Sequence, residues 1–294
     1  MEIFSVLNKM KHCQNIHKSN FYYLLLLASL FLINKSTLGQ TTWISEKGKA
    51  RAIPHAAIRE ADVMYSKRLW RIIDLKQKIN QPLYYPLNPI EERRSLFDII
   101  VSSVLEDCNV TAYNPGILGD DDEFKVMFTE NELNQLLNPK DTLWTEDLEG
   151  NPKQVIIDNK INSKMISHYE IKEDWFFDKN YSKMNVRIIG ICPYIKKHDP
   201  ISGEVIGSKP LFWIYFPSLR EELAKYYVYD GNNDLNITFD ALFARRMFDS
   251  YVSKESNIYD RSIVEYKTGA DRLYEAEIIL NELSNFEQDL WEQY

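Results

Sequence analysis

The 294 residues include 43 acidic and 35 basic side chains, which gives a net charge of −8 at pH 7. This acidic balance argues against nucleic acid or an anionic membrane surface as the partner, because both carry negative charge. The chain has ample apolar material for a core, with 45% hydrophobic residues, and its 10 glycines leave little material for phosphate-binding loops.

The first segment has the layout of a secretory signal peptide. Three lysines precede a mostly apolar run over residues 21–33, which is shorter than the roughly 20 residues that a helix needs to span a bilayer. Small residues follow the run, and cleavage is predicted before Gln40. We therefore expect residues 1–39 to be removed, with translation starting at Met1 or Met10; a short membrane anchor is the alternative. Removal takes away four lysines and one glutamate, so the mature chain is more acidic.

The next part is predicted to be an extended arm followed by helices. The arm covers residues 40–57, which are mostly small and polar. Apolar residues over Ile58–Ile79 recur at spacings of three, four and seven, which predicts a helix. The prolines of Pro82–Pro89 predict an extended, partly polyproline-like segment. A second helix is expected over Ser95–Glu106, with Ser95 as its N-cap.

The middle of the chain turns from helical to β patterns. A strand is expected over Phe124–Phe128, then a helix that begins with a capping box at Thr129, then a loop over Asn138–Pro152. Alternation and β-branched or aromatic residues predict further strands over Val155–Asp158, Ser167–Phe177, Met184–Lys196, Gly203–Phe216 and Tyr226–Tyr229. Helical spacing then predicts helices over Ser218–Leu223, Thr238–Tyr251 (with Met247 and Tyr251 facing inward) and Asp271–Trp291.

This order of elements predicts an α+β fold. N-terminal helices precede a central, mainly antiparallel sheet, and C-terminal helices follow it. Residues 58–258 are expected to form the main α+β domain, and residues 259–294 a C-terminal helical extension.

No catalytic, cofactor-binding or metal site is predicted. The histidines that follow the signal peptide, His55, His168 and His198, belong to no zinc-protease motif, and the chain has no nucleophile elbow and no phosphate loop. Calcium binding by Asp120–Glu123 is an alternative, but these acids lack the alternating ligands and central glycine of an EF-hand loop, which favours a solvated acidic turn. A nucleophilic Cys192 is disfavoured, because burial in an apolar strand raises a thiol pKa.

The cysteines and the basic pairs leave alternatives open. Cys108 and Cys192 follow the signal peptide and can form a disulfide in an oxidising compartment, or remain two buried thiols. The pairs Arg93-Arg94, Lys196-Lys197 and Arg245-Arg246 can contact acidic partners or wall polymers, or remain ordinary solvated charges.

Six blocks are distinctive in their content and in their order along the chain. They are Asp62–Pro89, Arg94–Asp98, Ile171–Asp178, Arg187–Ile191, Leu211–Pro217 and Phe243–Phe248. Together, from about residue 55 to about residue 258, they resemble the GldN/PorN family of gliding-motility and type IX secretion proteins.

The resemblance implies a non-enzymatic protein of the periplasm in Bacteroidota, needed for type IX secretion and for gliding where cells glide. It implies association with an outer-membrane lipoprotein of the GldK/PorK kind in a ring under the outer membrane. It also implies contact with the periplasmic part of a GldM/PorM-like motor protein. The lipoprotein would supply the membrane anchor, since no cysteine closely follows the apolar run of the leader.

A ring subunit needs two different faces that meet head to tail. The aromatic residues Trp70, Tyr84 and Tyr85 lie near turns and basic residues, a composition favoured at the centres of interfaces, and together with Arg93 and Arg94 they are the residues predicted for a subunit interface. We therefore expect the proline-rich segment to form part of a subunit contact. The alternative is that these aromatic residues complete the chain's own core.

Two other classes of function remain open at this stage. One is a secreted enzyme that acts on the cell wall or depends on calcium, and the other is a free periplasmic binding module. Copurification with an outer-membrane lipoprotein would favour the ring subunit, whereas wall hydrolysis or small-molecule affinity would favour the other two.

Overall fold

The computed structural model describes residues 51–292 except 91, 92, 108, 118, 147–151, 199–202 and 229–236. The chain divides into two units, Met1–Glu46 and Lys47–Tyr294, and every described residue belongs to the second. The predicted signal peptide and the first part of the predicted arm, residues 40–50, lie outside the described residues.

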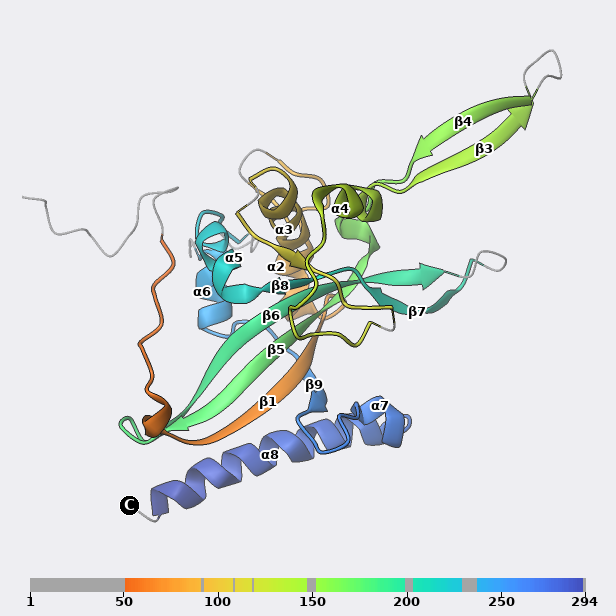
Figure 1. Cartoon of the computed structure of the whole chain (residues 1–294). Coiled ribbons are helices and arrows are strands. Elements are labelled where there is room, and N and C mark those ends of the chain that lie inside the picture. Colours follow the sequence, from red (N-terminus) through yellow and green to blue (C-terminus); the bar gives the residue numbers. More distant parts are fainter. Residues whose placement is uncertain are drawn as a thin grey trace, which may run out of the picture. The chain divides into compact units, whose positions relative to one another are not determined.

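A seven-stranded sheet forms the centre of the fold, with β5 and β6 in its middle (Figure 1). The strand order is β2-β8-β6-β5-β1-β9, with β7 pairing β6 as well, and the strand pairs are antiparallel. The strands are β1 (Val63–Asp74), β2 (Ala112–Tyr113), β5 (Ile166–Asp178), β6 (Lys183–His198), β7 (Val205–Pro210), β8 (Trp213–Tyr215) and β9 (Tyr251–Glu255). A separate two-stranded sheet consists of β3 (Lys140–Glu146) and β4 (Pro152–Asp158).

Helices precede and follow the long strands, which confirms the predicted α+β class. They are α2 (Gln81–Tyr84), α3 (Leu96–Leu105), α4 (Glu130–Leu137), α5 (Phe216–Leu223), α6 (Phe239–Ala244), α7 (Ile263–Tyr266) and α8 (Asp271–Glu292). Single 3-10 turns occur at Glu60–Asp62, Lys78–Asn80 and Ser163–Met165. Within the described ranges, no helix combines the length and the apolar character that crossing a bilayer requires.

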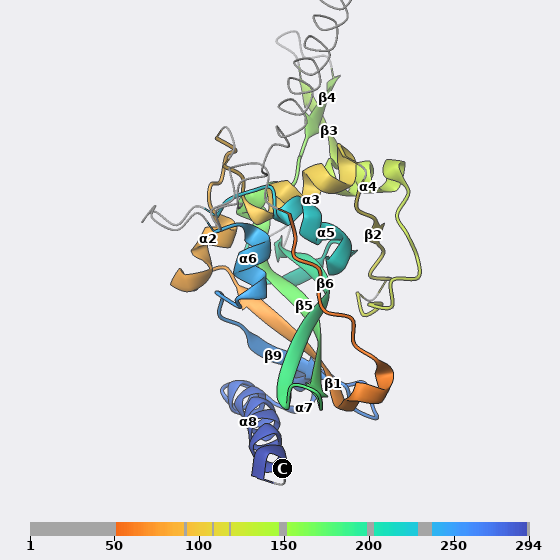
Figure 2. The same ribbon diagram turned by 90° about the vertical axis from the view of Figure 1, so that its left-hand side faces the viewer.

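One face of the sheet, which we call the helix face, carries Leu69 and Ile73 of β1. Ile73 belongs to the main core, in which residues of α3, α5 and α6 pack on β5 and β6. Leu69 belongs to a second core with Val252 of β9 and the inner residues of α8. Helix α8 runs beside β9 in both views (Figures 1 and 2). Since Leu69 and Ile73 are four residues apart on one strand, both cores lie on the same face.

A buried polar layer separates these two cores. Arg246 donates to the two carboxylate oxygens of Glu173 at 2.8 and 3.2 Å, and Trp175 Nε1 donates to the same carboxylate at 3.0 Å. Arg71 donates from Nε to Ser250 Oγ at 2.9 Å, and burial lowers the pKa of its guanidinium. Arg246, predicted as half of a basic pair, is therefore half-buried in an ion pair, whereas its neighbour Arg245 is exposed.

The helix termini agree with the capping signals in the sequence. Ser95 Oγ accepts from the Asp98 amide at the start of α3, as predicted. Thr129 and Glu132 form the predicted capping box of α4. The final helix was predicted over Asp271–Trp291 and extends from Asp271 to Glu292.

The first predicted helix, Ile58–Ile79, is wrong. Its centre is the strand β1, paired with β5 on one side and β9 on the other. The burial of β1 alternates along its first half, with Lys67 on the inward side because its ammonium group pairs with Glu255 at 2.6 Å. A charged residue at an inward position hid the alternation of polar and apolar residues that is typical of a strand. The alternation is also lost at Leu69 and Trp70, which are both buried because both faces of the sheet are covered there.

Other differences have local causes. The segment Pro82–Pro89 begins with residues of the short helix α2, since a proline is tolerated in the first turn, and becomes extended only at Tyr85. The helix predicted over Thr238–Tyr251 ends at Ala244, because Arg246 adopts a left-handed conformation (φ 52°), and the chain returns as β9. Met247 and Tyr251, predicted to face inward, are exposed.

Three strand and loop boundaries are also corrected. Phe124–Phe128 is not a strand: Phe124 has φ 56°, and Met127 makes a single bridge to Tyr113. The segment Gly203–Phe216 divides into β7 and β8. Part of the loop predicted over Asn138–Pro152 is the strand β3.

The described part of the predicted arm, residues 51–57, contains no helix or strand. Its carbonyl groups accept from two arginines: Arg187 donates to Ala56 O, and Arg220 donates to Ile53 O at 2.8 Å. Arg220 is buried and also pairs with Asp240 at 2.7 Å. The arm is thus held to the domain through its backbone.

Candidate functional site

A cleft of about 440 Å³ lies on the other face of the sheet, which we call the cleft face. Its floor consists of side chains from β1, β5, β6 and β9, among them Trp70, Glu170, Tyr194 and Ser253. Its walls come from the loop after β2, from β7, from the segment before α7 and from α7 itself. These contribute Gly119, Asp120, Asp122, Ser208, Asp260, Ser262, Val264 and Glu265.

Strand alternation places the floor residues on one face. Trp70 and Ile72 of β1 lie opposite Lys172 and Glu170 of β5 in the register of the two strands. On the other side, Trp70 lies opposite Lys254 of β9. Successive side chains of a strand point to opposite faces, so this row faces away from the helix face.

Trp70 is the centre of a charged network. Its indole Nε1 donates to Asp122, and Lys172 Nζ lies 3.1 Å from the same carboxylate. Lys254 Nζ lies 4.6 Å from the centre of the Trp70 ring and 2.7 Å from Asp260. The acidic turn predicted at Asp120–Glu123 is therefore partly internal, because Asp122 anchors it to the sheet.

Glu170 is held by two hydroxyl groups. Tyr194 donates to one carboxylate oxygen at 2.6 Å, and Ser253 donates to the other at 3.0 Å. Burial raises the pKa of Glu170 and that of Tyr194. Since each carboxylate oxygen already accepts a hydrogen bond, Glu170 acts in this structure as a structural acceptor.

His168 is an uncharged member of the floor at neutral pH. Burial lowers its pKa to about 4. Its ring stacks on that of Tyr194, with centres 4.6 Å apart, and its Nδ1 lies 2.8 Å from Ser167 Oγ. It therefore contributes no positive charge to the cleft near pH 7.

Trp213 of β8 lines the inner end of the cleft and is only 2% exposed. In the part of the chain that the structure describes, its buried indole Nε1 has no hydrogen-bond partner. It packs with Trp70 and Cys192. A buried donor without an acceptor is unfavourable, which makes this group a marker for a ligand.

Cys192 is fully buried beside the two tryptophans, and burial raises the pKa of its thiol. This environment lowers thiol reactivity, in agreement with the sequence interpretation. Cys108 lies outside the described residues, so the disulfide between these two cysteines stays a prediction. Among the described residues, no three His, Cys, Asp or Glu side chains are grouped as metal ligands would be.

The five residues predicted for a subunit contact are divided between two regions. Trp70 is on the cleft face and only 7% exposed, whereas Tyr84 packs partly against the main core. Tyr85 is exposed and meets the Tyr84 ring edge-on at 5.1 Å. Arg94 lies over the Tyr226 ring at 5.5 Å, and the Arg93 backbone pairs with Ile90. Tyr85 and Arg93 are the exposed members of this set.

The sequence interpretation missed the cleft. A signal was present in β5, where His168, Glu170, Lys172 and Asp174 occupy every second position, with the apolar Tyr169 and Ile171 between them. Such a polar row marks one face of a strand as different from the other. Its partners, Tyr194 and Lys254, are far away in the sequence, and only the strand pairing brings them to it.

Comparison with known proteins gives the family. No match was found among the curated proteins. The family model described as "Gliding motility associated protein GldN" matches residues 58–292, which extend from the end of the arm to the end of α8. The match covers most of the chain, and the chain therefore belongs to the GldN family.

Proposed function

We propose that this chain is a non-enzymatic structural subunit of the type IX secretion and gliding-motility machinery. In this proposal it forms a periplasmic ring with an outer-membrane lipoprotein of the GldK/PorK kind and contacts a GldM/PorM-like motor protein. It is held at the outer membrane peripherally, through the lipoprotein. The observation that carries the proposal is the match to the GldN family over residues 58–292.

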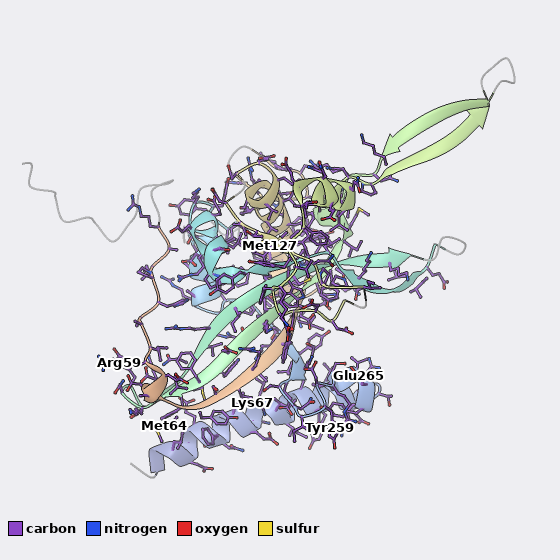
Figure 3. The ribbon with its side chains drawn as sticks, in the orientation of Figure 1. Arg59, Met64, Lys67, Met127, Tyr259 and Glu265 are labelled. Atoms are coloured by element: carbon purple, nitrogen blue, oxygen red, sulfur yellow. The ribbon has the colours of Figure 1, made fainter. Side chains whose placement is uncertain are left out.

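Two exposed apolar surfaces support a role in assembly. The first, the α7–α8 surface, has six exposed large side chains between residues 258 and 274: Ile258, Tyr259, Val264, Tyr266, Leu273 and Tyr274. Figure 3 shows Tyr259 on this segment. The second is the β7 edge, where Val205 and Ile206 are exposed. Exposed apolar and aromatic groups of this kind are typical of interaction sites.

The two surfaces belong to different edge strands of the sheet. Strand β9, which packs with α7 and α8, lies beyond β1, whereas β7 lies beyond β6. A head-to-tail ring requires two different surfaces on each subunit, and these two surfaces differ in structure. The outer edge of β7, which pairs with no other strand among the described residues, is also suited to pairing with another chain.

Coexpression with the lipoprotein, purification from envelopes and electron microscopy of the complex test the proposal. We expect Ile206→Asp at the β7 edge and Tyr274→Ser on α8 each to leave a folded chain that no longer assembles into rings. Glu277→Gln, an exposed change on α8, is the matched control and should assemble normally. Intact rings in both surface variants, or turnover of a wall substrate by the purified chain, would contradict the proposal.

The proline-rich segment remains part of the proposal as a further contact. Of its two tyrosines, Tyr85 is the exposed one, so a partner can reach it without unfolding α2. Tyr85→Ser should weaken assembly, whereas Tyr84 substitutions should mainly lower stability because Tyr84 packs against the core. Normal rings with a folded Tyr85→Ser variant would reject this contact.

A further inference from the structure

We propose that the cleft binds an extended, basic peptide segment of a partner protein. The inference deepens the proposed function, because it gives the chemistry of one partner contact for a subunit that works by binding other proteins. It stands on three features of the cleft: its charge, its buried unpartnered donor and the way its aromatic rings are already covered.

The lining carries an excess of acidic groups. Five carboxylates line the cleft, of which Asp122 pairs with Lys172 and Asp260 with Lys254, so the excess negative charge comes from the remaining three, Asp120, Glu170 and Glu265. Asp120 and Glu265 are exposed at the rim, and Figure 3 shows Glu265 on the segment around α7. Hydrogen bonds from the Ser262 hydroxyl and backbone hold the pKa of Glu265 below its ordinary value, so it is charged at neutral pH. Arginine or lysine side chains complement such a rim, and phosphate groups do not.

The inner end of the cleft requires a hydrogen-bond acceptor. Trp213 Nε1 is buried and, among the described residues, has no partner. A main-chain carbonyl of an extended peptide supplies an acceptor of the right kind, while the side chains of the peptide reach the rim. Tyr251 and Val264, both exposed at the cleft, provide apolar contact for the stems of long basic side chains.

The same geometry disfavours a sugar. Carbohydrate recognition uses open aromatic faces, but Lys172 and Lys254 both lie over the ring of Trp70. The Tyr194 ring stacks on His168. The faces of these two rings are therefore covered by the chain's own side chains, and the cleft offers mainly charged groups and hydrogen bonds to a ligand.

Fluorescence anisotropy with the purified chain tests the inference. The probe is a fluorescein-labelled peptide that alternates arginine and alanine, with a glutamate–alanine peptide and a disaccharide-peptide fragment of the cell wall as competitors. We expect saturable binding of the arginine peptide at physiological salt, and competition by neither of the other two. Asp120→Asn combined with Glu265→Gln should weaken binding about tenfold, since each rim charge contributes modestly.

The control is Glu277→Gln combined with Asp289→Asn on α8, which changes the net charge equally and leaves the cleft intact. It should bind within about twofold of the unchanged chain. Trp213→Phe, which removes the indole donor, should weaken binding about threefold to tenfold while circular dichroism shows an intact fold. Gln at position 265 preserves the capping box, so α7 stays in place.

Three results would overturn the inference: no binding of the arginine peptide, an equal loss of peptide affinity in the cleft variant and the α8 variant, or displacement of the arginine peptide by the wall fragment. Ring assembly is measured separately. If the chain binds the peptide but never assembles into rings, only the proposed function is contradicted. If it assembles into rings but does not bind the peptide, only the inference about the cleft is contradicted.

Discussion

Removal of the Arg246 guanidinium should destabilise the protein, because it leaves Glu173 charged and buried without its partner. Glu173 is 0% exposed, and both of its carboxylate oxygens accept from Arg246. The substitution Arg246→Met isolates the charge effect, since methionine retains an apolar stem beside Trp175 and Phe248, whose rings the guanidinium covers at 5.4 and 5.3 Å.

The magnitude follows from the burial of the two partners. Breaking a fully buried ion pair by removing one partner costs about 3–5 kcal/mol. The Arg246 side chain is 31% exposed, so water already screens the pair, and we expect a loss of about 2–3 kcal/mol. For a domain of this size, that loss corresponds to a decrease in Tm of about 4–12 °C.

Urea unfolding followed by tryptophan fluorescence measures the loss. Arg245→Met, a change at the exposed neighbouring position, is the control and should alter stability by less than about 0.5 kcal/mol. Glu173→Gln added to Arg246→Met removes the stranded charge and keeps an acceptor for Trp175 Nε1, so the double variant should regain more than half of the loss. If Arg246→Met unfolds within about 0.5 kcal/mol of the unchanged chain, the polar layer does not stabilise the junction between the two cores.

Three further changes test other parts of the fold. Ser95→Ala should cost about 1–2 kcal/mol in urea unfolding, because the hydroxyl caps α3 by accepting from the Asp98 amide, and an unchanged midpoint would show that the cap is replaceable. Gly190→Ala should cost about 1–3 kcal/mol and change the near-ultraviolet circular dichroism, because a Cβ there would lie 2.5 Å from the Phe124 ring; a normal spectrum and stability would refute this close approach. His168 has a folded pKa of about 4, below its ordinary 6.5, so its contribution to stability is complete above pH 6.5 and is lost as the pH falls towards 4. His168→Gln should therefore flatten the dependence of stability on pH in this window, by up to about 1.4 kcal/mol per pH unit, and an unchanged slope would exclude His168 as its source.

Local chemistry made several elements predictable. Helices α3 and α4 begin where a serine or threonine hydroxyl accepts from a backbone amide three residues later. This interaction involves only neighbouring residues, so the sequence contains everything that it needs. The long strands β5 and β6 were predictable in the same way, because their alternating patterns extend over many residues.

Strand β1 illustrates where local reasoning failed. Its inward positions include Lys67 and Arg71, whose partners Glu255 and Ser250 are more than 170 residues away. Before those partners are known, a lysine or arginine at such a position looks like a solvent-facing residue. The apolar residues that remain, Leu69 and Ile73, are four apart and fit a helix equally well.

The sequence by itself determined the family, the α+β class, the acidic character of the chain and the helix ends that depend on nearest neighbours. The tertiary structure decided that β1 is a strand, that Arg246 pairs with the buried Glu173, and that a polar row on β5 meets Tyr194 and Lys254 to form an acidic cleft. The physical reason is the same in each case: a charged or polar side chain is stable inside a protein only beside its partner, and the fold alone brings together partners that are distant in the sequence.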